Sequence, residues 1–314
     1  MAVEIITLTD QDSGSQAKIL AGHGFNCYQY RVAFGEPVID VLWSEPGFKT
    51  GEKRASGSGI PLLFPYAGRI RGRSLSWEGR EYPLEGDDGL GNAIHGYVLN
   101  RPWRVLDQSE TRVVGQFQAS VDEPKLLDRW PADFCITATY ELLGRTLASE
   151  FTVENPCDRP LPFGFGTHPY FRVPLGGADA EDCRVVLPVR QRWKLQDMLP
   201  TGERVEVAPE VKDEQGIAFG EMRFDDVFTG LDFEDGWCIC QVCDLESERQ
   251  LSIGFDQSFR ECVVYNPPHR EALCIEPLTC VPNAAELQAE GIDSGLRILA
   301  PGKSLQMKVI MQVD

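Results

Sequence analysis

The sequence predicts an all-β fold, a large antiparallel β-sandwich formed as a single domain by residues 1–314. Short alternating or β-branched runs recur along the chain and are broken by Gly, Pro, Asn and Asp, whereas helical periodicity is scarce. No linker, low-complexity segment or internal repeat divides these runs. Because 42% of the 314 residues are hydrophobic, the chain can bury a sizeable core without disulfides or a metal.

The predicted strands are spread evenly along the chain. Residues 74–84 (SLSWEGREYPL) predict a hairpin that turns at Glu78-Gly79, and residues 134–142 and 146–153 predict a meander around Gly144. One short helical turn is expected at residues 283–290. The other predicted strands are residues 111–120, 183–187, 237–242, 250–255, 262–265, 273–276 and 304–313. Such a sandwich offers a broad concave sheet face to a flat polar ligand.

The net charge and the lack of targeting signals exclude two classes of partner, nucleic acids and membranes. The formal net charge of −18 repels nucleic-acid phosphates and anionic lipid, so neither nucleic acid nor a membrane surface is an expected partner. Residues 1–12 lack the basic start and apolar core of a signal peptide, and no stretch approaches the roughly 20 apolar residues of a membrane span. The ten cysteines are then expected to be reduced thiols of a cytoplasmic protein.

Three of those cysteines, Cys238, Cys240 and Cys243 (CICQVC), have spacing that could hold zinc. No second cysteine pair or nearby histidine completes four ligands, and the surrounding run is apolar and strand-like. We therefore predict buried structural cysteines and no metal.

Two of the four histidines are candidates for proton transfer. His95 lies on a Gly-rich loop (GNAIHG), where a ligand-binding histidine and a turn-stabilising one are both consistent with the pattern. His168 lies between aromatic residues in FGFGTHPYF, and Pro169 restricts it to an extended conformation. A hydrogen-bonded histidine in a β-bulge is the alternative there. His23 and His269 are interpreted as surface turn residues.

Glu276 ends the apolar strand ALCIEP. Strand alternation places Ala272, Cys274 and Glu276 on one face, and Leu273 and Ile275 on the other. A carboxylate in such surroundings either pairs with a buried arginine or has its pKa raised by desolvation, and a raised pKa suits a general base.

These segments together resemble the aldose 1-epimerase (galactose mutarotase) family. The matching segments occur in the family's order and are residues 59–70 (GIPLLFPYAGRI), 92–96 (NAIHG), 167–171 (THPYF), 224–228 (FDDVF) and 273–284 (LCIEPLTCVPNA). The resemblance implies a single-domain galactose mutarotase-like β-supersandwich. It also implies an isomerase that interconverts the α and β anomers of free aldoses without metal or cofactor.

The resemblance also implies roles for individual residues. Glu276 would be the base that removes the proton from the sugar O1, and His168 the acid that protonates the ring oxygen O5. His95 and Arg69 would hydrogen-bond sugar oxygens. Asp225 matches the family's sugar-binding aspartate, although the adjacent Asp226 could occupy the same place one residue later.

Two departures from the family pattern leave the sugar open. Enzymes of this family that act on galactose usually carry Gln soon after the catalytic Glu, whereas Pro277-Leu278-Thr279 follows Glu276 here, so galactose is not specified. A related branch acts on hexose 6-phosphates and has His-Gly-x-x-Arg, where this chain has Leu99. Four arginines nevertheless keep a phosphorylated sugar as an alternative: Arg69, Arg71, Arg73 and Arg101. A carbohydrate-binding sandwich without catalysis is a third possibility, disfavoured because both the acid and base positions are occupied.

Overall fold

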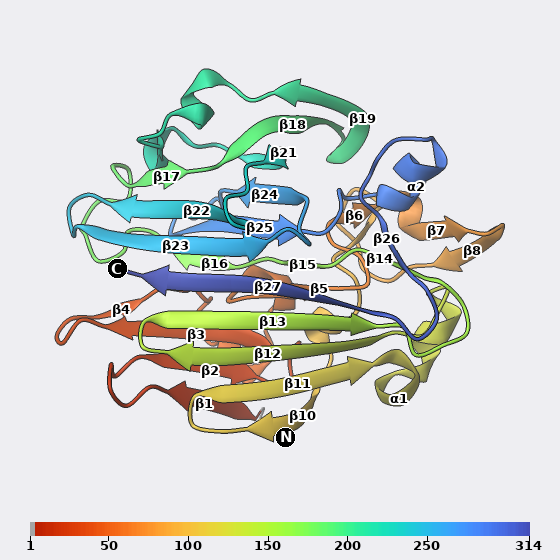
Figure 1. Ribbon diagram of the computed structural model, residues 1–314, viewed down its shortest axis with the longest axis horizontal. Helices are drawn as coiled ribbons and strands as arrows, with labels where there is room; N and C mark the ends of the chain where they lie inside the picture. Colours follow the sequence, from red (N-terminus) through yellow and green to blue (C-terminus); the bar gives the residue numbers. More distant parts are fainter. Residues whose placement is uncertain (1–3) are drawn as a thin grey trace.

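The protein is a two-layered β-sandwich in a computed structural model that describes residues 4–314, so the first three residues of the N-terminal segment discussed above lie outside it (Figure 1). One layer is a nine-stranded antiparallel sheet. Its strands are, in spatial order, β10 (Arg104–Gln108), β11 (Arg112–Gln118), β12 (Cys135–Leu143), β13 (Thr146–Glu154), β27 (Ser304–Val313), β23 (Arg249–Asp256), β22 (Trp237–Asp244), β17 (Arg184–Val186) and β20 (Ile217–Ala218).

The second layer contains an eight-stranded sheet and a four-stranded sheet, which are connected by single bridges at Cys27–Ile60 and Leu42–Phe171. The eight strands are β19 (Leu199–Glu206), β18 (Val189–Gln196), β21 (Asp225–Leu231), β24 (Glu261–Tyr265), β25 (Ala272–Leu278), β15 (Gly166–Thr167) and β5 (Leu62–Leu63), with β16 (Tyr170–Arg172) also paired to β25. The four-stranded sheet comprises β1 (Ile5–Thr9), β2 (Gln16–Leu20), β3 (Asn26–Ala33) and β4 (Val38–Asp40).

Short elements surround the two layers. Three two-stranded sheets are formed by β14 (Leu161–Phe163) with β26 (Arg297–Leu299), β6 (Arg69–Ile70) with β9 (Ala93–Ile94), and β7 (Ser74–Trp77) with β8 (Arg80–Pro83). The α-helices are α1 (Ala119–Asp122) and α2 (Ala284–Ala289), and the 3-10 helices are η1 (Phe48–Thr50), η2 (Ala55–Gly57), η3 (Arg71–Arg73), η4 (Val98–Asn100), η5 (Pro124–Asp128), η6 (Pro209–Lys212) and η7 (Phe219–Glu221). Within residues 4–314, no helix has the length and apolar character needed to cross a membrane.

Alternating side chains of facing strands fill the core between the layers. Along β12, Ile136, Ala138, Tyr140 and Leu142 are fully buried, and the intervening residues are half-buried. The same period of two recurs in β11 and β13, because successive strand residues point to opposite faces. Burying each large apolar side chain contributes about 1.5–3 kcal/mol, so the alternation in sequence is what selects this sandwich.

The structure confirms the predicted all-β sandwich, and each predicted strand overlaps an observed one. The hairpin turns at Glu78 and Gly79, both with positive φ, and α2 occupies the predicted helical turn. The structure adds strands that the sequence does not predict, notably β1–β4 and the β18–β19 hairpin. In β18 only Val189 and Trp193 are buried, so its sequence VRQRWKLQ lacks an apolar residue at every second position.

Glu261 is a buried carboxyl in the second layer, away from the predicted site. It lies on β24, is 1% exposed, and accepts a hydrogen bond of 2.9 Å from the Nε1 of Trp193. Burial raises its pKa from 4.5 to about 7, against the opposing hydrogen bonds from Trp193 and Thr229. Folding therefore favours the protonated form of this carboxyl.

Glu261→Gln is expected to stabilise the protein at alkaline pH. A group whose pKa rises on folding stabilises fully below its unfolded value, and this stability is lost as the pH rises through its folded value. The wild type should therefore lose roughly 3 kcal/mol through Glu261 between about pH 4.5 and pH 7. Urea unfolding at pH 5 and pH 8 measures this loss. Equal pH dependence in the wild type and Glu261→Gln would contradict the expectation.

Candidate active site

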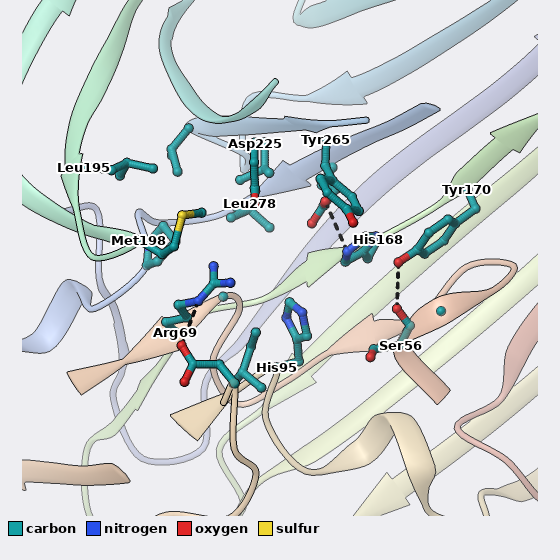
Figure 2. A pocket seen from close by; sticks show the side chains of 18 of the residues that line it. Ser56, Arg69, His95, His168, Tyr170, Leu195, Met198, Asp225, Tyr265 and Leu278 are labelled. Carbon is teal, nitrogen blue, oxygen red and sulfur yellow. Dashed lines mark hydrogen bonds and ion pairs between the residues drawn. The ribbon is translucent and has the colours of Figure 1, made fainter. Parts of the chain in front are cut away.

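A cavity of about 290 Å³ opens on the second layer, and all five residues predicted for the site line it (Figure 2). The residues that form its walls are Arg54, Ser56, Gly57, Gly68, Arg69, Asp88, Ile94, His95, His168, Tyr170, Leu195, Met198, Asp225, Val227, Val263, Tyr265, Glu276, Leu278 and Pro282. These residues come from segments up to about 230 positions apart in the chain. The sandwich therefore brings titratable and other polar side chains from distant segments together around one cavity.

Strand register explains the convergence on the sheet side of the cavity. Glu276 faces Val263 across the β24–β25 pair, and Asp225 faces Tyr265 across the β21–β24 pair. On the opposite face of β25, Leu273 and Ile275 belong to the main core. The predicted alternation along ALCIEP is thus confirmed, and Glu276 points away from the core into the cavity.

His168 lies between β15 and β16, where its backbone N–H donates to the carbonyl of Pro61 at 3.0 Å. Its ring stacks on that of Tyr170 with centroids 4.8 Å apart and planes only 4° apart. The hydroxyl of Tyr170 in turn donates to the backbone carbonyl of Ser56 at 2.8 Å. This stack fixes the ring orientation, so that the Nε2 of His168 lies 3.3 Å from the Oε1 of Glu276.

Burial governs the protonation of this histidine–carboxyl pair. It raises the pKa of Glu276 well above 4.5, and the nearby Asp225 adds to the rise while Arg69 opposes it. Burial also lowers the pKa of His168 to about 3, and Arg54 contributes to this decrease. Burial therefore favours the uncharged forms of both groups, a protonated carboxyl and a neutral imidazole, and the 3.3 Å contact is short enough for a proton to pass between them.

His95 follows β9 and adopts a positive φ of 68°. Its backbone N–H donates to the carbonyl of Gly68 at 2.9 Å, and the next residue, Gly96, packs so tightly that a side-chain carbon would overlap the backbone of Phe64. The His95 ring lies edge-on to that of His168, with centroids 5.4 Å apart. Burial, then the charge of His168, lowers the His95 pKa well below 6.5, so this ring is neutral.

Arg69 is held by Asp88 through a bond of 2.9 Å from its Nε. Although burial alone would raise the pKa of Asp88, hydrogen bonds from Asn92, Leu90 and Arg69 outweigh it and lower the pKa to about 2. The carboxylate therefore stays charged and keeps the guanidinium at the cavity wall. The sequence left open whether Glu276 pairs with a buried arginine. Arg69, which lines the same cavity, bonds to Asp88 instead.

The two adjacent aspartates of β21 point in different directions. Asp225 lines the cavity, whereas Asp226 pairs with the Nη1 of Arg192 at 2.6 Å. Burial raises the pKa of Asp225, Arg69 opposes the rise and the charge of Asp226 adds to it. Of the two candidates for a sugar ligand, Asp225 is the one positioned to contact a molecule in the cavity.

One set of side chains in residues 4–314 could hold a metal ion: donor atoms of His168, Cys274 and Glu276 lie within 4.8 Å of one another. Two of these three residues, His168 and Glu276, are the histidine–carboxyl pair described above. The CICQVC cysteines do not converge in the same way, because Cys238 and Cys240 are buried in the core and Cys243 lies on the opposite face of β22. The absence of a metal requirement stays a prediction.

The remaining predicted arginines and histidines lie outside the cavity lining. Three arginines each contact a carboxylate: Arg71 binds Glu286, Arg73 binds Asp87 and Arg101 binds Glu85. His269 is exposed as predicted and stacks on Trp43. The interpretation of His23 as a surface residue was wrong: it is 9% exposed and packs edge-on against Phe48, because the turn that carries it folds inward.

Several wall residues were not predicted from sequence. Tyr265 of β24 lines the cavity, as do Met198 and Leu195 of the β18–β19 hairpin (Figure 2). Arg54, which precedes η2, lines it as well. Their local sequences carry no Gly-His or Thr-His-Pro signal. Only the sheet register or the hairpin path brings them to the cavity.

Comparisons with known proteins agree with this architecture. The family model described as aldose 1-epimerase matches residues 4–312.

The chain belongs to the aldose 1-epimerase family.

Among relatives, the Escherichia coli K12 protein YphB is 24% identical over 294 residues, which cover 88% of this chain and 92% of that protein. A galactose mutarotase-like protein from Clostridium acetobutylicum superimposes with a TM-score of 0.86 at 22% identity, covering 100% of this chain and 99% of the other. Galactose 1-epimerase from Lactobacillus acidophilus superimposes with a TM-score of 0.74 at 17% identity, with coverage of 100% and 99%. These structures establish the galactose mutarotase-like fold of this family member.

Proposed function

We propose that this protein is an aldose 1-epimerase that interconverts the α and β anomers of an aldose by opening and reclosing the ring. The observation that carries the proposal is the 3.3 Å contact between the His168 Nε2 and the Glu276 Oε1 at the wall of the cavity. Ring opening moves protons at O1 and O5, which are bonded to the same carbon, C1. The acid and the base must therefore be neighbours, as these two atoms are.

In the proposed reaction, the proton of the pair first shifts from Glu276 to His168. The Glu276 carboxylate then takes the proton from O1, the C1–O1 bond becomes a carbonyl, the C1–O5 bond breaks, and His168 donates its proton to O5. Rotation about C1–C2 presents the other face of the aldehyde, and the steps reverse. Each step conserves the single proton of the pair, and acid–base contributions of this kind are worth roughly 10²–10⁴-fold each.

The other three predicted residues are proposed to bind the sugar. Neutral His95, the fixed guanidinium of Arg69 and the carboxyl of Asp225 line the same cavity and supply both donors and acceptors for hydroxyl groups. Tyr170 and Tyr265 present aromatic surface, on which the C–H face of a sugar can pack. An enzyme that acts on an aldose is favoured over a module that only binds carbohydrate, because binding alone does not require a buried histidine–carboxyl pair that shares a proton.

Polarimetry of freshly dissolved α-D-glucose and α-D-galactose tests the proposal. Catalytic amounts of the protein should speed the approach of optical rotation to equilibrium above the spontaneous rate. If neither these sugars nor the anionic hexoses considered below are accelerated, the proposed function is wrong.

The pH profile of kcat/KM should lack an acidic limb with its inflection near 6.5. Only the singly protonated pair is active, so activity should fall on the acidic side when His168 takes a second proton, with a pKa of about 3. On the alkaline side it should fall when Glu276 loses its proton, well above 4.5. We therefore expect no fall of kcat/KM with decreasing pH that has its midpoint between pH 5 and pH 7, after subtraction of the buffer-catalysed rate. An ordinary histidine titrating near 6.5 in this profile would contradict the shared-proton pair.

A further inference from the structure

Arg54 is a cation of the cavity wall whose role is not explained by the proposed chemistry. It precedes η2 and is exposed, and it lines the same cavity as His168 and Glu276. Within residues 4–314 its side chain forms no ion pair, and the hydrogen bond it makes is a 2.8 Å contact from its Nε to the hydroxyl of Ser56. By contrast, the four arginines that kept a phosphorylated sugar as an alternative each have a carboxylate partner: Arg69, Arg71, Arg73 and Arg101.

A chain of contacts places Arg54 on the His168 side of the cavity. Its Nε bonds to the Ser56 hydroxyl, the Ser56 carbonyl accepts the hydrogen bond of Tyr170, and the Tyr170 ring stacks on His168. Figure 2 shows Ser56 and Tyr170 on one side of His168, and Arg69 with Met198 on the other. The charge of Arg54 accordingly acts on His168, whereas the charge of Arg69 acts on Glu276.

The proposed reaction fixes how a pyranose lies between these two sides. O1 is at Glu276 and O5 is at His168, and the covalent path from O1 runs through C1, O5 and C5 to C6. The C6 substituent therefore lies beyond O5, on the side of Ser56 and Arg54. Gly57, which follows Ser56, also lines the cavity, and a side-chain carbon added to it would meet no atom within 4 Å, so the wall is open at this point.

We propose that Arg54 binds an anionic group on C6 of the sugar, so that the preferred substrates of this protein are aldohexoses with a C6 carboxylate or phosphate. The planar guanidinium can donate two parallel N–H hydrogen bonds to a carboxylate or to a phosphate. Either anion would displace the water that solvates Arg54 and would serve as its counter-ion. The inference rests on the proposed function for the orientation of the ring. Because the protein carries a net charge of −18, long-range attraction does not favour anions, and the preference depends on this local contact.

Steady-state kinetics with three sugars tests the inference: D-glucose, D-glucuronate and D-glucose 6-phosphate. We expect the wild type to have a kcat/KM at least tenfold higher for one or both anionic sugars than for glucose. The difference should lie mainly in KM, because Arg54 does not touch the reacting atoms. Arg54→Gln should lower kcat/KM for the anionic sugars roughly 10- to 100-fold more than for glucose. Arg71→Gln, which removes an exposed arginine outside the cavity lining, is the matched control and should keep the wild-type ratio.

The outcomes separate this inference from the proposed function. Acceleration of all three sugars with no preference for the anions, or an equal loss for all three in Arg54→Gln, overturns the role of Arg54 and leaves the epimerase function intact. If no sugar is accelerated, calorimetric titration of the wild type and Arg54→Gln with glucuronate and glucose 6-phosphate still decides the matter: weaker binding by the variant supports the inference, and unchanged binding overturns it. A preference for only one of the two anions identifies whether the C6 group is a carboxylate or a phosphate.

Discussion

Glu276→Gln is expected to lower kcat for anomer exchange by roughly 10²–10⁴-fold, because the amide cannot accept the O1 proton. The amide keeps the size of the carboxyl and can still contact His168, so KM should change by less than about threefold. NMR exchange spectroscopy at equilibrium measures the rate directly, without interference from spontaneous mutarotation. Glu290→Gln, an exposed glutamate at the end of α2, is the matched control and should retain wild-type kcat. A variant with more than about a third of wild-type kcat would exclude Glu276 as the base.

His168→Asn should reduce kcat over the same range, because the leaving O5 then has no proton donor within reach. His269→Asn is the control, since this histidine is exposed and lies outside the cavity lining. The double variant with Glu276→Gln gives the sharper result. Because the two groups exchange one proton and act as a unit, the double variant should be little slower than either single variant. Losses that multiply would show that the two residues act independently and would contradict the shared proton proposed from the 3.3 Å contact.

Much of the fold can be predicted from local sequence patterns. The alternation in residues 134–142 and 146–153 predicts β12 and β13 because one face of each strand must be buried. The strand β27 occupies the predicted residues 304–313. By contrast, β18 buries only every fourth residue and follows no two-residue pattern, so its place at the cavity, and that of Met198 beyond it, could not be read from composition.

The candidate site was predicted unevenly for a related reason. His168, His95 and Glu276 lie in short segments with distinctive neighbours, so they could be singled out one by one, whereas Arg69 was found only through the family resemblance. Asp225 and Asp226 could not be distinguished, because adjacent residues in a strand differ only in the face to which they point. The register between β21 and β24 decides this, and it puts Asp225 in the cavity and Asp226 against Arg192. His23 was predicted to be a surface residue and is buried, since a Gly-rich turn can fold inward as readily as outward.

The sequence by itself determined the all-β sandwich, the family and the candidate residues for proton transfer. Those properties depend on side-chain chemistry and on short-range periodicity. The tertiary structure alone decided that Glu276 and His168 meet at 3.3 Å, that burial moves their pKa values in opposite directions, and that Arg54, on the His168 side, has no carboxylate partner among residues 4–314. Distances across strands and exclusion from water arise only when segments more than a hundred residues apart are packed together, and both are therefore absent from any local pattern.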